Sequence, residues 1–322
     1  MPGIWTHIRF GRMVLEQSGE QRLLSSPELE RCFVLGCLGP DFLYCRRLMP
    51  WPKRSLMNVL ADRLHRQDPL PMLLDLLDGV SGCPRDGSDA DEAVVYTLGF
   101  ILHLLLDAAM QPDGSLSPNG EEAVRRSLNL DDQTLDRHES LEAEARLDAW
   151  MLQAAAGPLP ETVIENYECM IAVHHADLAP YVKKDDWNKS MRGMLAALRH
   201  LQNPRGLRSM IASRFIAPEA YSRVRRDGLD SVHSAGPSTP HSSGEPGQAW
   251  EAYLGLVDPA AGLLAIVVRW LRASAFRGEA ALSVAARQSA AAAEDFGWHE
   301  AELRTALVRR LEEWFRDPPG TL

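Results

Sequence analysis

Apolar residues recur every three or four positions along most of this chain, with polar residues between them, which is the pattern of amphipathic helices. The spacing predicts helices at residues 5–17, 27–37, 55–66, 69–78, 89–110, 134–156, 160–176, 186–202, 249–276 and 279–316. No run alternates Val, Ile, Thr and aromatic residues with polar ones in the way that a sheet strand requires. We therefore expect an all-α protein.

One predicted helix differs from the others because it is hydrophobic on nearly all of its faces. It spans residues 89–110, and its apolar stretch runs from Val94 to Ala109. A helix of this character belongs in the middle of a core. Residues 227–248 are rich in Gly, Ser and Pro and predict a flexible loop. No internal repeat is visible, and we expect residues 1–322 to form a single helical domain.

Composition and charge indicate a globular protein and argue against some classes of binding partner. The chain has 322 residues, of which 45% are hydrophobic and 24% are charged, as in globular domains. Its formal net charge of −10 argues against a nucleic-acid partner and against tight electrostatic binding to an anionic membrane. We expect no transmembrane segment, because no charge-free apolar run approaches about 20 residues. The N-terminus lacks the pattern of a signal peptide and the cysteines lack a paired spacing, which together indicate a cytoplasmic protein.

The most informative candidates for chemistry lie on the apolar helix. His103 and Asp107 are four residues apart, so both side chains project from one face among Leu, Ile and Phe neighbours. Each buried polar group without a partner costs about 1–3 kcal/mol, so both side chains need partners. A metal ion would satisfy both, since zinc binds imidazole nitrogen and carboxylate oxygen. A hydrogen bond between His103 and Asp107 inside a helical bundle is the alternative.

Other candidate side chains are weaker when each is taken alone. His7 lies on the first predicted helix, where a lone histidine is more often a surface or core residue than a metal ligand. Asp41 follows Gly-Pro and could be a turn residue, and His65 could be a solvated helix end. His138 and Glu142 are again four apart, but a Glu-rich surface helix produces such a pair by chance.

The order of these residues resembles the zinc-dependent phospholipase C family, including its shorter bacterial members without a secretion signal. The matching segments are Thr6-His7, Gly39-Pro40-Asp41, Leu64-His65 and the helix motif Leu-Gly-Phe-x-x-His-x-x-x-Asp from Leu98 to Asp107. The resemblance covers roughly residues 1–150, and the helix motif is its most specific part. It implies a multi-helix bundle like that of phospholipase C and P1 nuclease.

The resemblance also implies a ligand set. His65, His103 and Asp107 would hold one zinc ion, with Asp41 beside it as a ligand or a general base. His7 would join Asp107 at a neighbouring zinc ion. One to two zinc ions are therefore expected from these five residues.

A further zinc site implied by the resemblance is altered in this chain. His138 and Glu142 would belong to it, but Gln111 stands where the family has a histidine before proline. Because Gln offers only a neutral amide oxygen, this site should bind zinc weakly. In a second register Glu144 is the ligand and Ser140 replaces the histidine, which weakens the site further.

Three functions remain open from the sequence. The first is a zinc-dependent phosphodiester hydrolase that acts on a phosphodiester or a phospholipid head group, with Asp41 orienting or deprotonating the attacking water. The second is a degenerate family member that keeps the helical fold and at most partial zinc binding, acting as a binding or scaffold protein. The third is a helical interaction protein whose motif matches are coincidental.

Overall fold

The computed structural model describes residues 4–46, 55–82, 88–110, 157–202, 253–275 and 300–319. Across these ranges the chain forms α-helices, short 3-10 helices and turns, and no strand. The predicted all-α class is confirmed for this part of the chain. The predicted helix at 134–156 and the predicted loop at 227–248 lie outside the described residues, as do residues 249–252, 276 and 279–299 of the last two predicted helices.

The helices follow the predicted order, with shifted ends. They are α1 (Ile4–Gln17), η1 (Gln21–Leu24), α2 (Pro27–Cys37), η2 (Gly39–Arg46), α3 (Leu56–Arg66), α4 (Pro69–Gly82), α5 (Ser88–Met110), α8 (Glu161–His174), η3 (Ala179–Tyr181), α9 (Lys184–Gln202), α13 (Val257–Ala275) and α15 (Glu300–Arg316). α4 runs to Gly82, beyond the predicted end at residue 78, because apolar Leu77 and Val80 continue its buried face. The predicted helix at 160–176 ends earlier, at His174.

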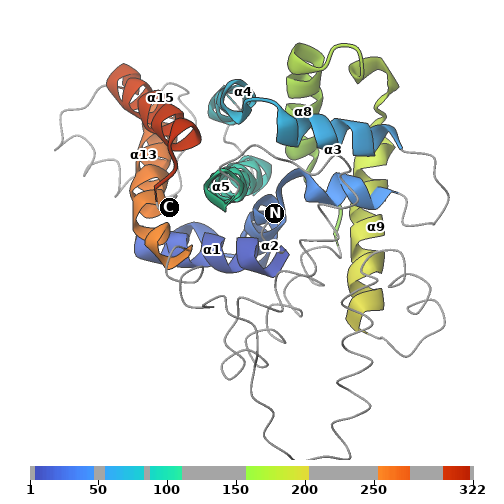
Figure 1. Ribbon diagram of the computed structural model, residues 1–322, viewed down its shortest axis with the longest axis horizontal. Helices are drawn as coiled ribbons and strands as arrows, with labels where there is room; N and C mark the ends of the chain where they lie inside the picture. Colours follow the sequence, from blue (N-terminus) through green and yellow to red (C-terminus); the bar gives the residue numbers. More distant parts are fainter. Residues whose placement is uncertain are drawn as a thin grey trace, which may run out of the picture.

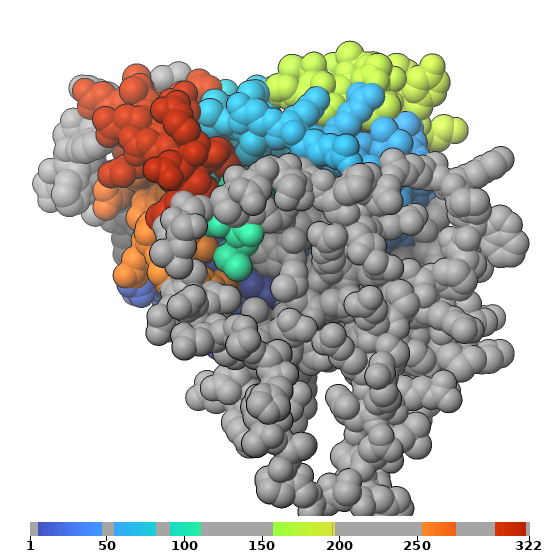
Figure 2. Space-filling view, viewed as in Figure 1, coloured from blue at the N-terminus to red at the C-terminus, as the bar shows by residue number. Residues whose placement is uncertain are grey.

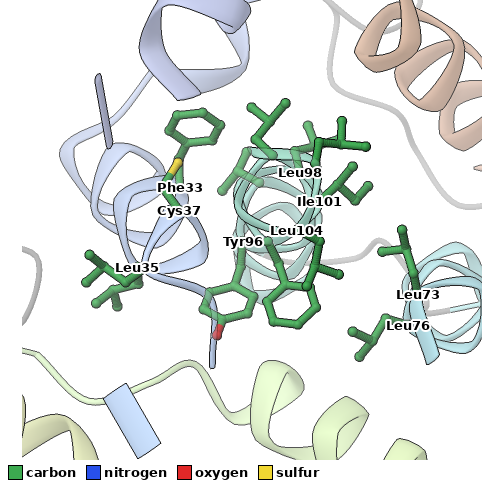
Figure 3. Close-up of a cluster of buried hydrophobic side chains, with 14 of the residues drawn as sticks. Phe33, Leu35, Cys37, Leu73, Leu76, Tyr96, Leu98, Ile101 and Leu104 are labelled. Carbon is green, nitrogen blue, oxygen red and sulfur yellow. The ribbon is translucent and has the colours of Figure 1, made fainter. Parts of the chain in front are cut away.

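α5 is the central helix, as its apolar character predicts. Figure 1 shows it nearly end-on, with α4 above it, α1 and α2 below it, and α13 and α15 to one side. In Figure 3, Phe33 and Cys37 of α2 face it from one side, and Leu73 and Leu76 of α4 lie on the other. Burial of apolar surface at about 25 cal/mol per Å² makes this core the main source of stability.

α2 and α5 approach each other closely enough for their backbones to touch. A Cβ on Gly99 of α5 would lie 2.4 Å from the carbonyl oxygen of Phe33, and a Cβ on Gly36 of α2 would lie 2.0 Å from that of Tyr96. Only glycine fits at either position. The contact places the C-terminal end of α2 beside the turn of α5 that carries His103.

The chain that follows α2 is held between other helices. α2 begins with Ser26, whose hydroxyl accepts from the backbone N–H of Leu29, and Pro27 occupies its first turn. After α2 ends, the chain reverses into η2, which packs between α3 and α9. At the end of η2, Arg46 donates to Asp186 of α9 with an Nη2–Oδ1 distance of 2.8 Å. These contacts fix the turn that carries Asp41.

Two described helices are long and apolar enough to cross a membrane by length and composition, within Asp91–Met110 and Tyr253–Ser274. The tested windows are 83% and 56% buried inside the protein, respectively. Burial of 83% of the α5 window is what a core helix requires.

Figure 2 shows α15 (red) and α4 (light blue) side by side at the surface.

Candidate metal centre

Five polar side chains from four elements meet in the core at the C-terminal half of α5. They are His7 of α1, Asp41 of η2, His65 of α3, and His103 and Asp107 of α5. The side chains of the first four are between 0% and 5% exposed, and that of Asp107 is 14% exposed. The centre is thus almost closed, and solvent reaches it at Asp107.

The distances between donor atoms fit a shared ion. Nε2 of His65 lies 3.0 Å from Oδ1 of Asp41 and 4.0 Å from Oδ2 of Asp107. Nε2 of His103 lies 3.2 Å from Oδ2 of Asp107, and Nε2 of His7 lies 3.4 Å from Oδ1 of Asp107. Ligand atoms at about 2.1 Å from a tetrahedral zinc are about 3.4 Å apart. The observed separations bracket that value.

Backbone carbonyls orient two of the three imidazoles. Nδ1 of His103 donates to the carbonyl of Cys37 at 3.1 Å, and Nδ1 of His65 donates to the carbonyl of Ala61 at 2.8 Å. A carbonyl only accepts, so each Nδ1 carries a proton and each Nε2 is turned towards the carboxylates. Metal-binding histidines in proteins are usually oriented in this way.

The converging atoms have no hydrogen bonds of their own. Among the described residues no hydrogen-bond partner exists for the buried Nε2 atoms of His7, His65 and His103, nor for Oδ1 of Asp41 and Asp107. Buried polar atoms are almost always paired in native proteins, and each unpaired one is costly. A shared cation would satisfy all five atoms, and so would protons on the imidazoles, whose Nε2 atoms lie 3.0–3.4 Å from carboxylate oxygens.

The two carboxylates dominate the electrostatics of the centre. Burial tends to raise the pKa of Asp107, but His103 and His7 outweigh it and hold this pKa well below its usual range. Burial likewise opposes ionisation of Asp41, and His65 and His103 nevertheless lower its pKa. Both carboxylates are therefore ionised, and they require positive charge nearby.

The histidines respond in different ways to this negative charge. Burial tends to lower the pKa of His65, but Asp41 and Asp107 outweigh it and raise the pKa to about 9. The pKa of His103 is also raised against burial, by Asp107. The pKa of His7 is lowered by burial and by His103, whose ring it stacks upon at a centroid distance of 4.1 Å. Without an ion, protons on His65 and His103 supply the positive charge.

The donors form two overlapping sets that could each hold an ion. One set is His7, His103 and Asp107, and the other is Asp41, His65 and His103. Within each set all donor atoms lie within 4.8 Å of one another. Because Nδ1 of His103 is hydrogen-bonded to the carbonyl of Cys37, only Nε2 of this ring is left to bind a metal. Nε2 can bind one ion at a time, so the two sets compete for His103.

The position of Asp107 on its helix adds to the demand for a cation. Asp107 lies in the last turn of α5, which carries no basic residue. The C-terminal end of a helix carries a partial negative charge, so an ionised carboxylate there is unfavourable unless a cation lies beside it.

The structure brings together five of the residues singled out from the sequence, namely His7, Asp41, His65, His103 and Asp107. The remaining candidates, His138 and Glu142, lie outside the described residues, as do Gln111, Ser140 and Glu144.

Sequence reasoning missed the groups that support the five. These are the carbonyls of Cys37 and Ala61, the α-carbon of Gly39 and the ring of Tyr44, whose centroid lies 5.7 Å from that of His65. Gly39, directly before Pro40-Asp41, was the only signal in the sequence for this support. Backbone carbonyls leave no such signal in the sequence, because every residue has one.

No protein-family model matches this chain, and no curated protein or solved structure matches it either. The resemblance to the zinc-dependent phospholipase C family therefore stays a prediction from the sequence. The geometry of the five side chains is therefore the main support for a function.

Proposed function

We propose that this protein is a zinc-dependent phosphodiester hydrolase of the phospholipase C type, with its metal centre at His7, Asp41, His65, His103 and Asp107. The observation that carries the proposal is the convergence of five buried donor atoms without hydrogen-bond partners among the described residues. The all-α fold with α5 at its centre is compatible with the phospholipase C and P1 nuclease type of bundle.

The residues present fit a zinc ion by charge and by donor type. Two ionised carboxylates offset the charge of one divalent cation, and neutral imidazoles add no further charge. Imidazole nitrogen and carboxylate oxygen are both common zinc donors, whereas calcium and magnesium prefer oxygen alone. The fixed Nδ1 protons of His65 and His103 leave their Nε2 atoms free to bind the metal.

The assignment of ligands follows the family resemblance, since the donor distances by themselves divide the five residues into two sets of three that share His103. Asp41, His65, His103 and Asp107 would hold one zinc ion, and His7 with Asp107 would contribute to a second, incomplete position. A bound zinc ion supplies a Lewis acid that lowers the pKa of water to about 7 and offsets charge on phosphoryl oxygens.

The protein's own groups supply the remaining parts of a hydrolytic site. Asp41 is ionised and fixed by η2, so it is suited to orient an attacking water or take its proton. Asp107 is the most exposed of the five side chains, so the substrate would approach from its side. The family resemblance of the donor order supports a phosphodiester, such as a phospholipid head group, as the substrate class.

One observation favours a second candidate function. Four of the five side chains are at most 5% exposed, and closed sites are typical of structural zinc, whereas catalytic zinc keeps an open position. A degenerate family member that binds zinc for stability, and acts as a binding or scaffold protein, would have this appearance. Turnover separates the two functions.

The test combines metal analysis with turnover. Purified protein should contain one to two zinc ions and hydrolyse bis(p-nitrophenyl) phosphate, and His103→Ala should lose both properties. His174→Ala is a matched control, because His174 pairs with Asp75 at 2.6 Å at the surface of another part of the fold. A protein that retains zinc but shows no turnover of this substrate or of dispersed phospholipid would support the structural role. A protein without zinc after exposure to it would refute both.

A further inference from the structure

Gly39 is the residue at which the chain leaves α2 and turns into η2. Its φ is +54°, in the left-handed region that favours glycine. Helices commonly end on such a glycine, so this conformation alone gives Gly39 no role in the metal centre.

The surroundings of Gly39 are unusual for a helix end. A Cβ at this position would lie 2.3 Å from Cδ2, 2.4 Å from Cγ and 2.6 Å from Nε2 of His103. Carbon atoms normally approach no closer than about 3.5 Å, so any side chain here would displace the imidazole. Cδ2 is bonded to both other atoms, and the three similar distances mean that the Cβ would lie over the flat face of the ring rather than at its edge.

The ring of His103 is therefore enclosed. His7 stacks on the ring with an interplanar angle of 24°, and this leaves the other face to Gly39. The hydrogen bond from Nδ1 to the carbonyl of Cys37 fixes the rotation of the ring between them. The chain from Cys37 to Gly39 thus sets the direction in which Nε2 of His103 points.

We propose that Gly39 is a positioning residue of the metal centre, which requires the absence of a Cβ and acts by holding the imidazole of His103 in its ligating orientation. The expected effect of Gly39 on metal binding rests on the proposed function. The contact between Gly39 and His103 itself does not depend on a metal, so the two can be tested separately.

Gly19 provides a matched control. It follows α1 as Gly39 follows α2, two residues beyond the end of the helix, and its φ is +75°. Among the described residues no atom lies within 4 Å of the position where its Cβ would be. Gly19→Ala therefore carries the cost of the backbone conformation without the collision.

The first measurement is a double-variant cycle in the metal-free protein, read by denaturant unfolding. Gly39→Ala should lower the unfolding midpoint more than Gly19→Ala does. In the His103→Ala background the effect of Gly39→Ala should shrink to that of Gly19→Ala, since the collision is gone. An equal loss in both backgrounds would overturn the proposal. If Gly39→Ala alone does not fold, recovery of folding in the double variant supports the proposal, and failure to recover overturns it.

The second measurement is titration with cobalt(II), whose visible absorption reports the geometry of its ligands. Gly39→Ala should bind cobalt at least tenfold more weakly than wild type and with a changed spectrum, whereas Gly19→Ala should match wild type. Wild-type affinity and spectrum in Gly39→Ala would overturn the proposal. If the wild-type protein binds no cobalt, the proposed metal centre fails, and the cycle still decides the role of Gly39.

Discussion

Asp107 connects the candidate metal centre because its two oxygens face different imidazoles. Oδ1 lies 3.4 Å from Nε2 of His7, whereas Oδ2 lies 3.2 Å from that of His103 and 4.0 Å from that of His65. These histidines come from α1, α5 and α3, so one carboxylate joins three helices. Its charge therefore affects both the affinity for a cation and the protonation of the neighbouring histidines.

Replacing Asp107 with Asn tests this role while keeping the shape of the side chain. Asn has no charge and only one oxygen, so zinc affinity should fall by more than the roughly 10- to 100-fold typical of losing a supporting residue. Competition with a chromophoric chelator measures the affinity. Asp75→Asn is the control, since Asp75 is a half-exposed carboxylate that pairs with His174 on another part of the fold, so its replacement should leave affinity unchanged. Equal affinity in Asp107→Asn and wild type would contradict the ligand assignment.

The raised pKa of His65 predicts a pH dependence for the metal-free protein. Its pKa is about 9 in the folded protein and 6.5 as the reference value. A raised folded pKa contributes stability that is fully present below 6.5 and is lost as pH rises through about 9. The loss corresponds to about 3 kcal/mol over the full window. Denaturant unfolding of chelator-treated protein should therefore show falling stability between pH 6.5 and about 9.

His65→Gln supplies the control for this pH dependence. Gln cannot titrate, so the slope of stability against pH in this window should become smaller, with the remainder due to His103, whose pKa is also raised. Added zinc should stabilise the wild-type protein more at the upper end of the window, because a metal competes with protons for the same nitrogens. A metal-free protein whose stability rises with pH here would contradict the assigned charges.

At the scale of elements, periodicity was sufficient to predict the described α-helices but not all of their ends. α5 was predicted within one residue because its apolar run is long and bounded by a clear break. α8 stops at His174, where the chain turns back so that the N–H groups of Leu178 and Ala179 bond to the carbonyl of His175. Such a turn is set by tertiary packing, which a helical spacing does not encode.

The candidate site was predictable only in part, for the same reason. The spacing of His103 and Asp107 places both on one face of a helix, which is a local property. His7, Asp41 and His65 approach these two residues because α1, η2 and α3 pack around α5. In the sequence, only the order of the motifs indicated that the five residues belong together. The carbonyl of Cys37 meets His103 because two glycines allow α2 and α5 to touch, and no local pattern predicts that contact.

The close contact of α2 with α5 leads to a prediction at this scale. A Cβ in Gly99→Ala would lie 2.4 Å from the carbonyl oxygen of Phe33, and backbone atoms cannot move aside as a flexible side chain can. We expect a loss of about 1–3 kcal/mol in the free energy of unfolding, as for overpacked cores. Zinc affinity should fall as well, since separation of the helices withdraws the carbonyl of Cys37 from His103.

Gly262→Ala is the matched control for this prediction. Gly262 lies within α13, is exposed, and has no described atom within 4 Å of its Cβ position. The substitution should raise stability by about 0.5–1 kcal/mol, because Ala favours helix more than Gly does. A Gly99→Ala protein as stable as wild type would show that α2 and α5 do not pack as closely as described.

At the scale of the whole molecule, the candidate centre and the C-terminal helices support different sides of α5. The five side chains of the centre come from α1, η2, α3 and α5, all before residue 111. On another side, Nε1 of Trp314 in α15 donates to the carbonyl of Leu105 at 2.9 Å. Arg272 of α13 also pairs with Glu20 at 2.7 Å. Figure 1 shows α13 and α15 on one side of α5, and α3 and α9 on the other.

This division predicts how the protein loosens when the proposed zinc ion is removed. After chelation, only protons on the histidines offset the negative charges of Asp41 and Asp107. Hydrogen exchange should therefore accelerate first in η2 and at the His65 end of α3. α15 should keep its protection, because it packs on α13, α4 and a side of α5 away from the centre. Trp314→Ala should give the reverse, with faster exchange in α15 and unchanged exchange in η2. Uniform acceleration across all helices on chelation would mean that the described part of the chain unfolds as one cooperative unit, with the metal centre supporting all of it.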